Sequence, residues 1–147
     1  MTELNLSIRA ATAADDKLIK SMINRAQLDP SNVHWENFLL AENEGEVIGI
    51  GQLKPYSDCT ELGSLVTLRA YRGKGVAASI IKALEAKARF PLYLICRDIM
   101  EAYYESFGYK KISFQETPFS LKLKLLVSLL YRLVGIEVIA MKKPSAD

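Results

Sequence analysis

Hydrophobic and polar positions along the chain repeat with two different periods, which predicts strands interleaved with helices. Residues 6–9 alternate with period two, as a half-buried strand does, and residues 12–15 resemble a capping box at the start of a helix. Apolar residues then recur at helical spacing: Leu18, Ile19, Met22 and Ile23. The chain therefore begins with a strand followed by an amphipathic helix.

The middle of the chain predicts a hairpin and then a strand, loop, helix and strand in succession. Residues 38–41 and 46–53 are apolar runs on either side of a polar turn, while residues 61–68 are apolar on both faces, as in a central strand. The helix that follows carries its apolar residues at Val76, Ile80, Ile81, Leu84 and Ala88. Phe90 and Pro91 end that helix before a buried strand over 92–96.

The last third of the chain predicts two more helices and two more strands. A helix over 99–107 ends at Gly108, which suits a left-handed C-cap, and a strand follows over 109–114. A helix over 121–134 and a strand over 137–142 close the chain. The predicted fold class is mixed α/β.

Composition indicates one globular domain over residues 1–147. The chain is 50% hydrophobic and 24% charged, with a formal net charge of +2, so it lies far from the composition of disordered proteins. An apolar run near the ~18 residues that span a bilayer is absent, and the first nine residues lack a signal-peptide pattern. We therefore expect a cytoplasmic protein.

The residue inventory excludes several kinds of site. Two cysteines, Cys59 and Cys96, are too few for a disulfide framework, and with His34 as the only histidine we expect neither a metal site nor a Ser-His-Asp triad. Charge is uneven: residues 1–70 carry 6 Lys and Arg against 10 Asp and Glu, a net −4, whereas residues 71–147 carry 13 against 7, a net +6. An anionic ligand would prefer the second half, although no nucleic-acid partner is expected.

A glycine-rich turn follows the central strand directly. Gly73 and Gly75 allow a phosphate to approach the main chain at the positive end of the next helix, and Arg69, Arg72 and Lys74 add cations around it. An ordinary basic turn is the alternative interpretation.

The segment Arg72-Gly73-Lys74-Gly75-Val76-Ala77 resembles the pyrophosphate signature of the GCN5-related N-acetyltransferase (GNAT) superfamily. A second motif, residues 103–109 (YYESFGY), is similar to the family's aromatic segment before Gly-Phe or Gly-Tyr, and the order of elements agrees over residues 7–113. The resemblance implies the GNAT fold, a mostly antiparallel sheet with a splayed parallel pair of strands flanked by helices.

The resemblance also implies a site for acetyl-CoA as cosubstrate, without a metal. The pantetheine arm would pair with the central strand, and the pyrophosphate would lie on the amides of the turn. The residues implied are Leu65, Val66, Thr67, Arg72, Gly73, Lys74, Gly75, Val76, Ala77 and Ala78.

Two residues are candidates for proton transfer. On the helix over 99–107, Ile99, Tyr103 and Phe107 form a predicted core stripe, so that Tyr104 projects away from it. Its phenol suits reprotonation of a departing CoA thiolate, and the alternative is a Tyr that covers the edge of the core. Glu61 matches the position at which several GNAT branches have a glutamate base, and the alternative is a solvated carboxylate at the strand entry.

Arg97 departs from the family, most members of which have an asparagine there. N-acetylglutamate-synthase-like members have a similar arginine, so Arg97 is a candidate for binding an acceptor carboxylate, with an ion pair to Asp98 or Glu101 as the alternative. Cys96 is expected to lie in the core rather than to act as a nucleophile.

The segment over 121–134 is the least family-like part of the chain. Its apolar positions nearly encircle the predicted helix, so we expect it to pack against the sheet or against a second subunit in a homodimer. A basic amphipathic helix on a membrane is the less favoured alternative.

Together these features predict an acetyl-CoA-dependent N-acetyltransferase in which a primary amine attacks the thioester directly in a ternary complex. The acceptor, a small molecule or a protein amine, is left open by the sequence. A non-catalytic acyl-CoA-sensing module is one alternative. A dinucleotide-dependent oxidoreductase is another, because Gly73, Gly75 and Ala78 also fit a Rossmann fingerprint, but only one βαβ unit is visible.

Overall fold

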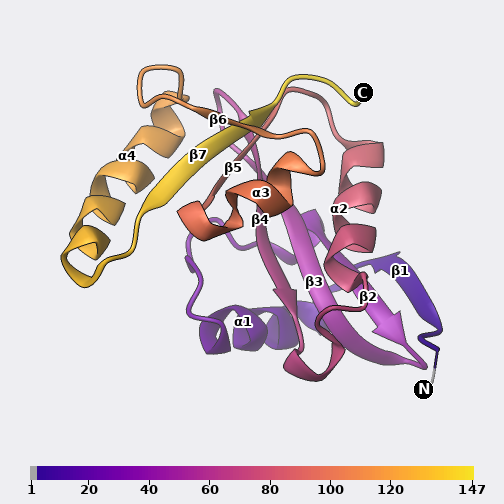
Figure 1. Cartoon of the computed structure of the whole chain (residues 1–147). Helices are drawn as coiled ribbons and strands as arrows, with labels where there is room; N and C mark the ends of the chain where they lie inside the picture. Colours follow the sequence, from indigo (N-terminus) through magenta and orange to yellow (C-terminus); the bar gives the residue numbers. More distant parts are fainter. Residues whose placement is uncertain (1–2) are drawn as a thin grey trace. The chain divides into compact units, whose positions relative to one another are not determined.

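The computed structural model describes residues 3–147, which divide into two compact units (Figure 1). Unit 1 comprises the chain up to Lys54 together with Leu62–Ala88, and unit 2 comprises Pro55–Glu61 together with Arg89–Asp147. Each unit is thus assembled from separate stretches of sequence. The prediction of one domain over residues 1–147 stays a prediction.

Unit 1 contains four strands and two long helices. Its elements are β1 (Leu6–Ala10), η1 (Ala13–Asp15), α1 (Asp16–Arg25), η2 (Trp35–Asn37), β2 (Phe38–Asn43), β3 (Glu46–Pro55), β4 (Thr60–Thr67), η3 (Arg69–Tyr71) and α2 (Val76–Lys87), of which Pro55, Thr60 and Glu61 belong to unit 2. Strand β1 pairs antiparallel with β2 and β2 pairs antiparallel with β3, with a bulge between Ala41 and Glu42. Strand β4 lies next to β3.

The two helices of unit 1 cover opposite faces of its strands. Ile19, Met22 and Ile23 of α1 are buried in one cluster with Phe38, Leu40 and Ile50. Side chains alternate between the two faces of a strand, so Gly49 and Gly51 lie on the other face, which α2 covers (Figure 1).

Glycines on β3 allow this close approach of α2. A Cβ atom at Gly49 would lie 2.8 Å from Val76 Cγ1, and one at Gly51 would lie 2.7 Å from Ile80 Cγ2. Both distances are too short for real atoms, so a side chain at either position would push away α2, whose first turn forms the candidate phosphate site. Nothing in the hydrophobic pattern of residues 46–53 predicts this role.

Unit 2 is built around three strands that follow α2. Its elements are β5 (Leu92–Arg97), η4 (Asp98–Met100), α3 (Glu101–Glu105), β6 (Lys110–Ile112), α4 (Phe119–Ser128), η5 (Leu129–Val134) and β7 (Val138–Lys143). Strand β7 pairs antiparallel with both β5 and β6. The first residues of β4 add a parallel partner to β5, where Glu61 pairs with Tyr93.

The pairing gives the strand order β1-β2-β3-β4-β5-β7-β6, in which β4 and β5 are a parallel pair. The mixed α/β fold class and the mostly antiparallel sheet with one parallel pair are thereby confirmed. The predicted helix over 121–134 is an α-helix only to Ser128 and continues as a 3₁₀ helix. Within residues 3–147, the helices are too short or too polar to cross a membrane.

Candidate functional site

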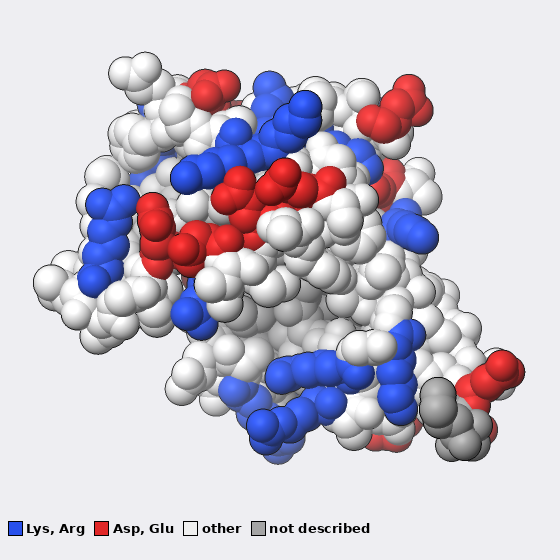
Figure 2. Space-filling model, viewed as in Figure 1, with Lys and Arg blue, Asp and Glu red and all other residues white. Residues whose placement is uncertain are grey.

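In unit 1, the turn between β4 and α2 is an exposed basic loop. The chain leaves β4 through the 3₁₀ turn η3 and enters α2 at Gly75, the N-cap. Arg69, Arg72 and Lys74 are all exposed there, and Figure 2 shows Lys and Arg side chains gathered at this end of unit 1, in the lower part of the view. The predicted combination of a helix N-terminus and surrounding cations is therefore present.

The two glycines of this turn have left-handed backbone conformations. The φ angle is +77° at Gly73 and +82° at Gly75, values that side-chain-bearing residues adopt at a cost. A Cβ atom built on either residue meets nothing within 4 Å. Both residues thus leave open space above the first N–H groups of α2, which lack intrahelical acceptors, and this is what an approaching anion requires.

The cationic side chains around the turn have partners within unit 1. Arg72 Nε donates to the Thr67 carbonyl at 3.2 Å, and Lys74 Nζ lies 5.8 Å from the centre of the Tyr71 ring. Leu65, Val66 and Thr67, the residues predicted to pair with the pantetheine arm, are half-buried on β4. These contacts hold the cations close to the end of β4.

In unit 2, Glu61 lies in a buried polar cluster that the sequence pattern does not predict. Only 5% of the residue is exposed, and its Oε1 accepts hydrogen bonds from the Tyr56 hydroxyl and from Lys124 Nζ, each at 2.9 Å. Lys124 also lies 5.3 Å from the centre of the Tyr56 ring. Burial is the main cause that raises the pKa of Tyr56, so this hydroxyl remains a donor.

This cluster excludes the alternative of a solvated strand-entry carboxylate at Glu61. A carboxylate that enters a strand and faces solvent would be exposed, whereas Glu61 is buried and paired. Its cationic partner comes from α4, 63 residues later in sequence, and neither helical periodicity nor motif spacing could have identified it.

Tyr104 lies on α3, among the aromatic side chains of unit 2. Its ring meets Tyr103 and Tyr109 edge to face, with centroids 5.3 and 6.2 Å apart. Burial is the largest of the causes that hold the pKa of Tyr104 well above its ordinary value, followed by the charges of Cys96 and Tyr103. The phenol therefore stays protonated across the physiological range.

The predicted orientation of this helix was wrong. Ile99 is 68% exposed and Tyr103 37% exposed, whereas Tyr104 is half-buried, so the expected core stripe of Ile99, Tyr103 and Phe107 faces partly toward solvent. The reason is that residues 98–100 form a 3₁₀ turn and the α-helix spans only Glu101–Glu105, which changes the angular positions assumed for one continuous helix.

Two further sequence candidates lie at the end of β5. Arg97, the last residue of β5, is exposed and pairs with Val138 of β7. Cys96 is half-buried with its sulfur 3.8 Å from Met141 Sδ, and burial, together with Glu101 and Asp98, raises the pKa of its thiol to about 12. A thiol with this pKa has almost no thiolate near neutral pH, consistent with the expectation that Cys96 is not a nucleophile.

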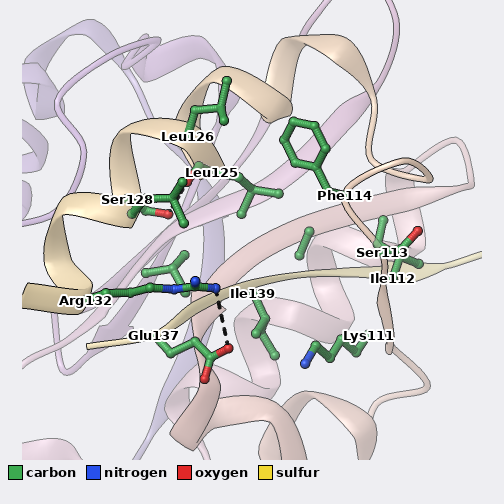
Figure 3. A pocket seen from close by; sticks show the side chains of 13 residues that line it. Lys111, Ile112, Ser113, Phe114, Leu125, Leu126, Ser128, Arg132, Glu137 and Ile139 are labelled. Carbon is green, nitrogen blue, oxygen red and sulfur yellow. Dashed lines mark hydrogen bonds and ion pairs between the residues drawn. The ribbon is translucent and has the colours of Figure 1, made fainter. Parts of the chain in front are cut away.

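A separate groove lies in unit 2 between the segment 125–132 and strands β6 and β7 (Figure 3). It has a volume of about 400 Å³ and is lined mostly by apolar side chains, among them Ile112, Leu125 and Ile139. At one end Arg132 and Glu137 approach each other to 3.9 Å. Within residues 3–147, we find no group of three or more His, Cys, Asp or Glu side chains arranged to hold a metal ion.

Solved structures of acetyltransferases share this fold. The N-acetylglutamate synthase of Neisseria gonorrhoeae, in complex with coenzyme A and L-arginine, is 20% identical with a TM-score of 0.74, and the match covers 97% of this chain and 34% of the synthase chain. Rv2747 of Mycobacterium tuberculosis, in complex with CoA and NLQ, is 18% identical with a TM-score of 0.73, and the match covers 94% and 98% of the two chains. The chain thus spans about a third of the synthase but nearly all of Rv2747.

A further similar structure is a GNAT-family acetyltransferase of Staphylococcus aureus, 12% identical with a TM-score of 0.69, covering 95% of this chain and 98% of that one. A search of curated proteins finds no significant match. The sequence profile of the acetyltransferase (GNAT) family matches residues 8–109, a range that contains the glycine turn, Glu61 and Tyr104. The predicted resemblance is confirmed: the chain belongs to the acetyltransferase (GNAT) family.

Proposed function

We propose that the protein is an N-acetyltransferase that moves the acetyl group of acetyl-CoA to a primary amine by direct attack in a ternary complex. The observation that carries this proposal is the pair of left-handed glycines, Gly73 and Gly75, with open space above the N-terminus of α2. Exposed Arg72 and Lys74 beside them favour a doubly charged pyrophosphate at this position.

The pantetheine arm would extend along Leu65, Val66 and Thr67, pairing with β4 as an added strand does. In this proposal a main-chain amide near Val66 holds the thioester carbonyl and stabilises the negative charge that develops on its oxygen during attack. Binding along a strand also holds the thioester in a fixed orientation toward the amine, which increases the rate of attack.

Glu61 is the proposed base. The Glu61 carboxylate takes a proton from the acceptor ammonium, directly or through water. The neutral amine nitrogen then forms a bond to the thioester carbon, the carbon–sulfur bond breaks, and the nitrogen loses a second proton as the amide forms. Because Lys124 donates to Glu61 Oε1, the acceptor ammonium would either replace Lys124 or use the second carboxylate oxygen.

Tyr104 is the proposed acid, returning a proton to the departing CoA thiolate. Burial keeps its pKa above the ordinary value, so the phenol carries its proton at every pH at which the enzyme works. The CoA thiolate takes the phenol proton, and the second proton that the nitrogen loses as the amide forms restores the phenol, so that one proton reaches sulfur and the proton held by Glu61 returns to solvent.

For the acceptor, we propose an amine that also carries a carboxylate. The exposed guanidinium of Arg97 at the end of β5 suits a bidentate carboxylate partner. One similar structure is an N-acetylglutamate synthase, whose name describes acetylation of an amino acid, although the likeness at 20% identity extends only to the fold.

A second candidate function is a non-catalytic acyl-CoA-binding module. The observation that favours it is the buried ion pair of Glu61 with Lys124, since a carboxylate already paired with an internal ammonium is less available as a base. The two candidates share the CoA site and differ in turnover.

Thiol release from acetyl-CoA, measured with a panel of amines with and without carboxylates, separates the two functions. The enzyme releases thiol only with an amine present, and Tyr104→Phe lowers kcat by about 10²–10⁴-fold without changing the KM for acetyl-CoA. Tyr103→Phe, a change on the neighbouring and more exposed tyrosine, serves as the matched control and keeps wild-type turnover. Binding of acetyl-CoA without thiol release for any amine would identify the sensing module instead.

A further inference from the structure

The segment Phe119–Val134, which comprises α4 and η5, exposes an unusual amount of apolar surface. Leu121 is fully buried, and apart from the half-buried Leu125 every other large apolar side chain of the segment is exposed. These exposed residues are Phe119, Leu123, Leu126, Val127, Leu129, Leu130, Tyr131, Leu133 and Val134. Of the two expected modes of packing, burial within unit 2 is seen at Leu121 and partly at Leu125, while packing against a second subunit stays a prediction. So many exposed apolar side chains in one segment mark an interaction site.

Two polar groups at the start of the segment bond to other parts of unit 2. Lys124 Nζ donates to the buried Glu61 carboxylate at 2.9 Å, and the Ser120 amide donates to Asp58 Oδ2 at 3.1 Å. Polar contacts thus anchor α4 to unit 2 while its leucines point outward.

The segment itself carries only positive charge, and the nearest acids in sequence are the exposed Glu116 and Glu137. Residues 118–136 contain Lys122, Lys124 and Arg132 but no Asp or Glu. Lys122 lies 5.2 Å from the centre of the Phe114 ring, and the side chain of Arg132 is 63% exposed. The contact of Arg132 with Glu137 at 3.9 Å joins two exposed groups and is therefore weak, which leaves the guanidinium accessible to other anions.

The end of the segment is apolar all round. All six residues of η5, Leu129–Val134, are exposed, and five of them are apolar or aromatic. In Figure 2 the left of the view is largely white, with blue and red side chains beside it. A rigid partner contacts one side of such a tip, whereas a fluid apolar medium surrounds it.

Charge argues against a second copy of the chain as the occupant. A twofold interface places the same segment on both partners, so Lys122 and Arg132 of one copy would face those of the other, and the segment Phe119–Val134 holds no Asp or Glu to pair with them. An anionic lipid surface covers the exposed apolar side chains and also provides negative charge for Lys and Arg.

We propose that the α4–η5 segment docks on the surface of an anionic lipid bilayer. Leu129, Leu130 and Leu133 enter the boundary between headgroups and acyl chains, while Arg132 and Lys122 lie among the anionic headgroups. The protein lies on the bilayer through this segment and does not cross it.

Vesicle co-sedimentation of the full chain tests the proposal. The vesicles contain phosphatidylcholine alone, or phosphatidylcholine and phosphatidylglycerol in equal amounts. The variant Leu130→Gln with Leu133→Gln removes apolar contacts from exposed positions, so folding is retained. Ile99→Gln is the matched control, because Ile99 is 68% exposed and Leu130 69% exposed.

We expect the wild type and Ile99→Gln to bind the anionic vesicles and the double variant to bind them roughly 100-fold more weakly, since each leucine removed from an apolar medium changes the partition about tenfold. Added salt should weaken binding of the wild type, because exposed cations are screened. The proposal is overturned if the wild type fails to bind anionic vesicles, or if the double variant binds as well as the wild type. It is also overturned if sedimentation shows a dimer that the double variant dissociates while no vesicle binding occurs.

Discussion

A glutamate at Gly75 tests the phosphate site directly. The change places a carboxylate and a side chain in the open space above the first turn of α2, where the pyrophosphate is proposed to bind. We expect Gly75→Glu to abolish measurable binding of CoA while the protein remains folded.

Gly75→Glu is expected to change two quantities, the folding stability and the affinity for CoA. A residue with a side chain at φ +82° costs about 1–2 kcal/mol of folding stability. The carboxylate about 4 Å from a phosphate opposes binding by roughly 4 kcal/mol at an effective dielectric constant near 20. The electrostatic opposition alone corresponds to an increase in the Kd for CoA on the order of 1,000-fold.

The hairpin turn between β2 and β3 offers a control with the same backbone strain. Gly45 also has φ +82°, and a Cβ there also meets nothing within 4 Å. Gly45→Glu should therefore show a similar loss of thermal stability and unchanged affinity for CoA. Isothermal titration calorimetry measures the Kd of both variants and of the wild type for CoA and acetyl-CoA. Equal affinity of Gly75→Glu and the wild type, or an equal loss in Gly45→Glu, would refute the reasoning.

Three further predictions concern the ionisable groups. Arg9 bonds to Asp15 at 2.8 Å and holds its pKa well below the ordinary value, so the carboxylate stabilises the fold above pH ~3.9 and this contribution is lost as the pH falls. Asp15→Asn should lower the free energy of unfolding at pH 7 by about 1.5–3 kcal/mol. Urea titrations should show that the difference in this free energy between variant and wild type narrows below pH ~4, and a difference that is the same at every pH would contradict the prediction. Lys124→Met should destabilise the protein by about 3–5 kcal/mol because it leaves Glu61 buried without its cation, and the double variant with Glu61→Gln should recover part of that loss; additive losses would argue against a coupled pair. Cys96→Ser should keep wild-type turnover, because a thiol with a raised pKa is not expected to act as a nucleophile; a loss of several orders of magnitude in kcat would contradict this.

Local sequence signals predicted most of the fold correctly. The helices of unit 1 and the strands around the glycine turn were visible because period and capping are properties of neighbouring residues. The observed α2, Val76–Lys87, begins at the residue predicted from its apolar spacing. The glycine turn was identified for the same reason, since its left-handed conformations require residues without a Cβ atom.

Contacts between distant parts of the chain were not predictable in this way. The partner of Glu61 is Lys124, a residue on a helix that carries no motif. The function of Gly49 and Gly51 also depends on tertiary packing, because only the approach of α2 makes a side chain there impossible. In both cases the determining neighbour is set by the fold and is invisible to sequence periodicity.

The segment over 121–134 shows how composition alone can mislead. An apolar pattern on all sides predicts burial, because burial is what usually satisfies such a pattern. In the structure, inward polar anchors at Ser120 and Lys124 leave the leucines outside instead. Hydrophobic periodicity alone does not distinguish an apolar residue that packs inward from one that remains exposed to an external partner.

The most direct test of the proposed function follows the acetyl group itself. The protein is incubated with acetyl-CoA labelled with ¹³C in the acetyl group and with a panel of primary amines, and the products are identified by mass spectrometry. We expect a labelled N-acetyl amine and an equal amount of free CoA, formed by the wild type and not by Gly75→Glu. Acetyl-CoA that is bound but left unconsumed, or hydrolysed to labelled acetate with every amine, would contradict the assignment as an N-acetyltransferase.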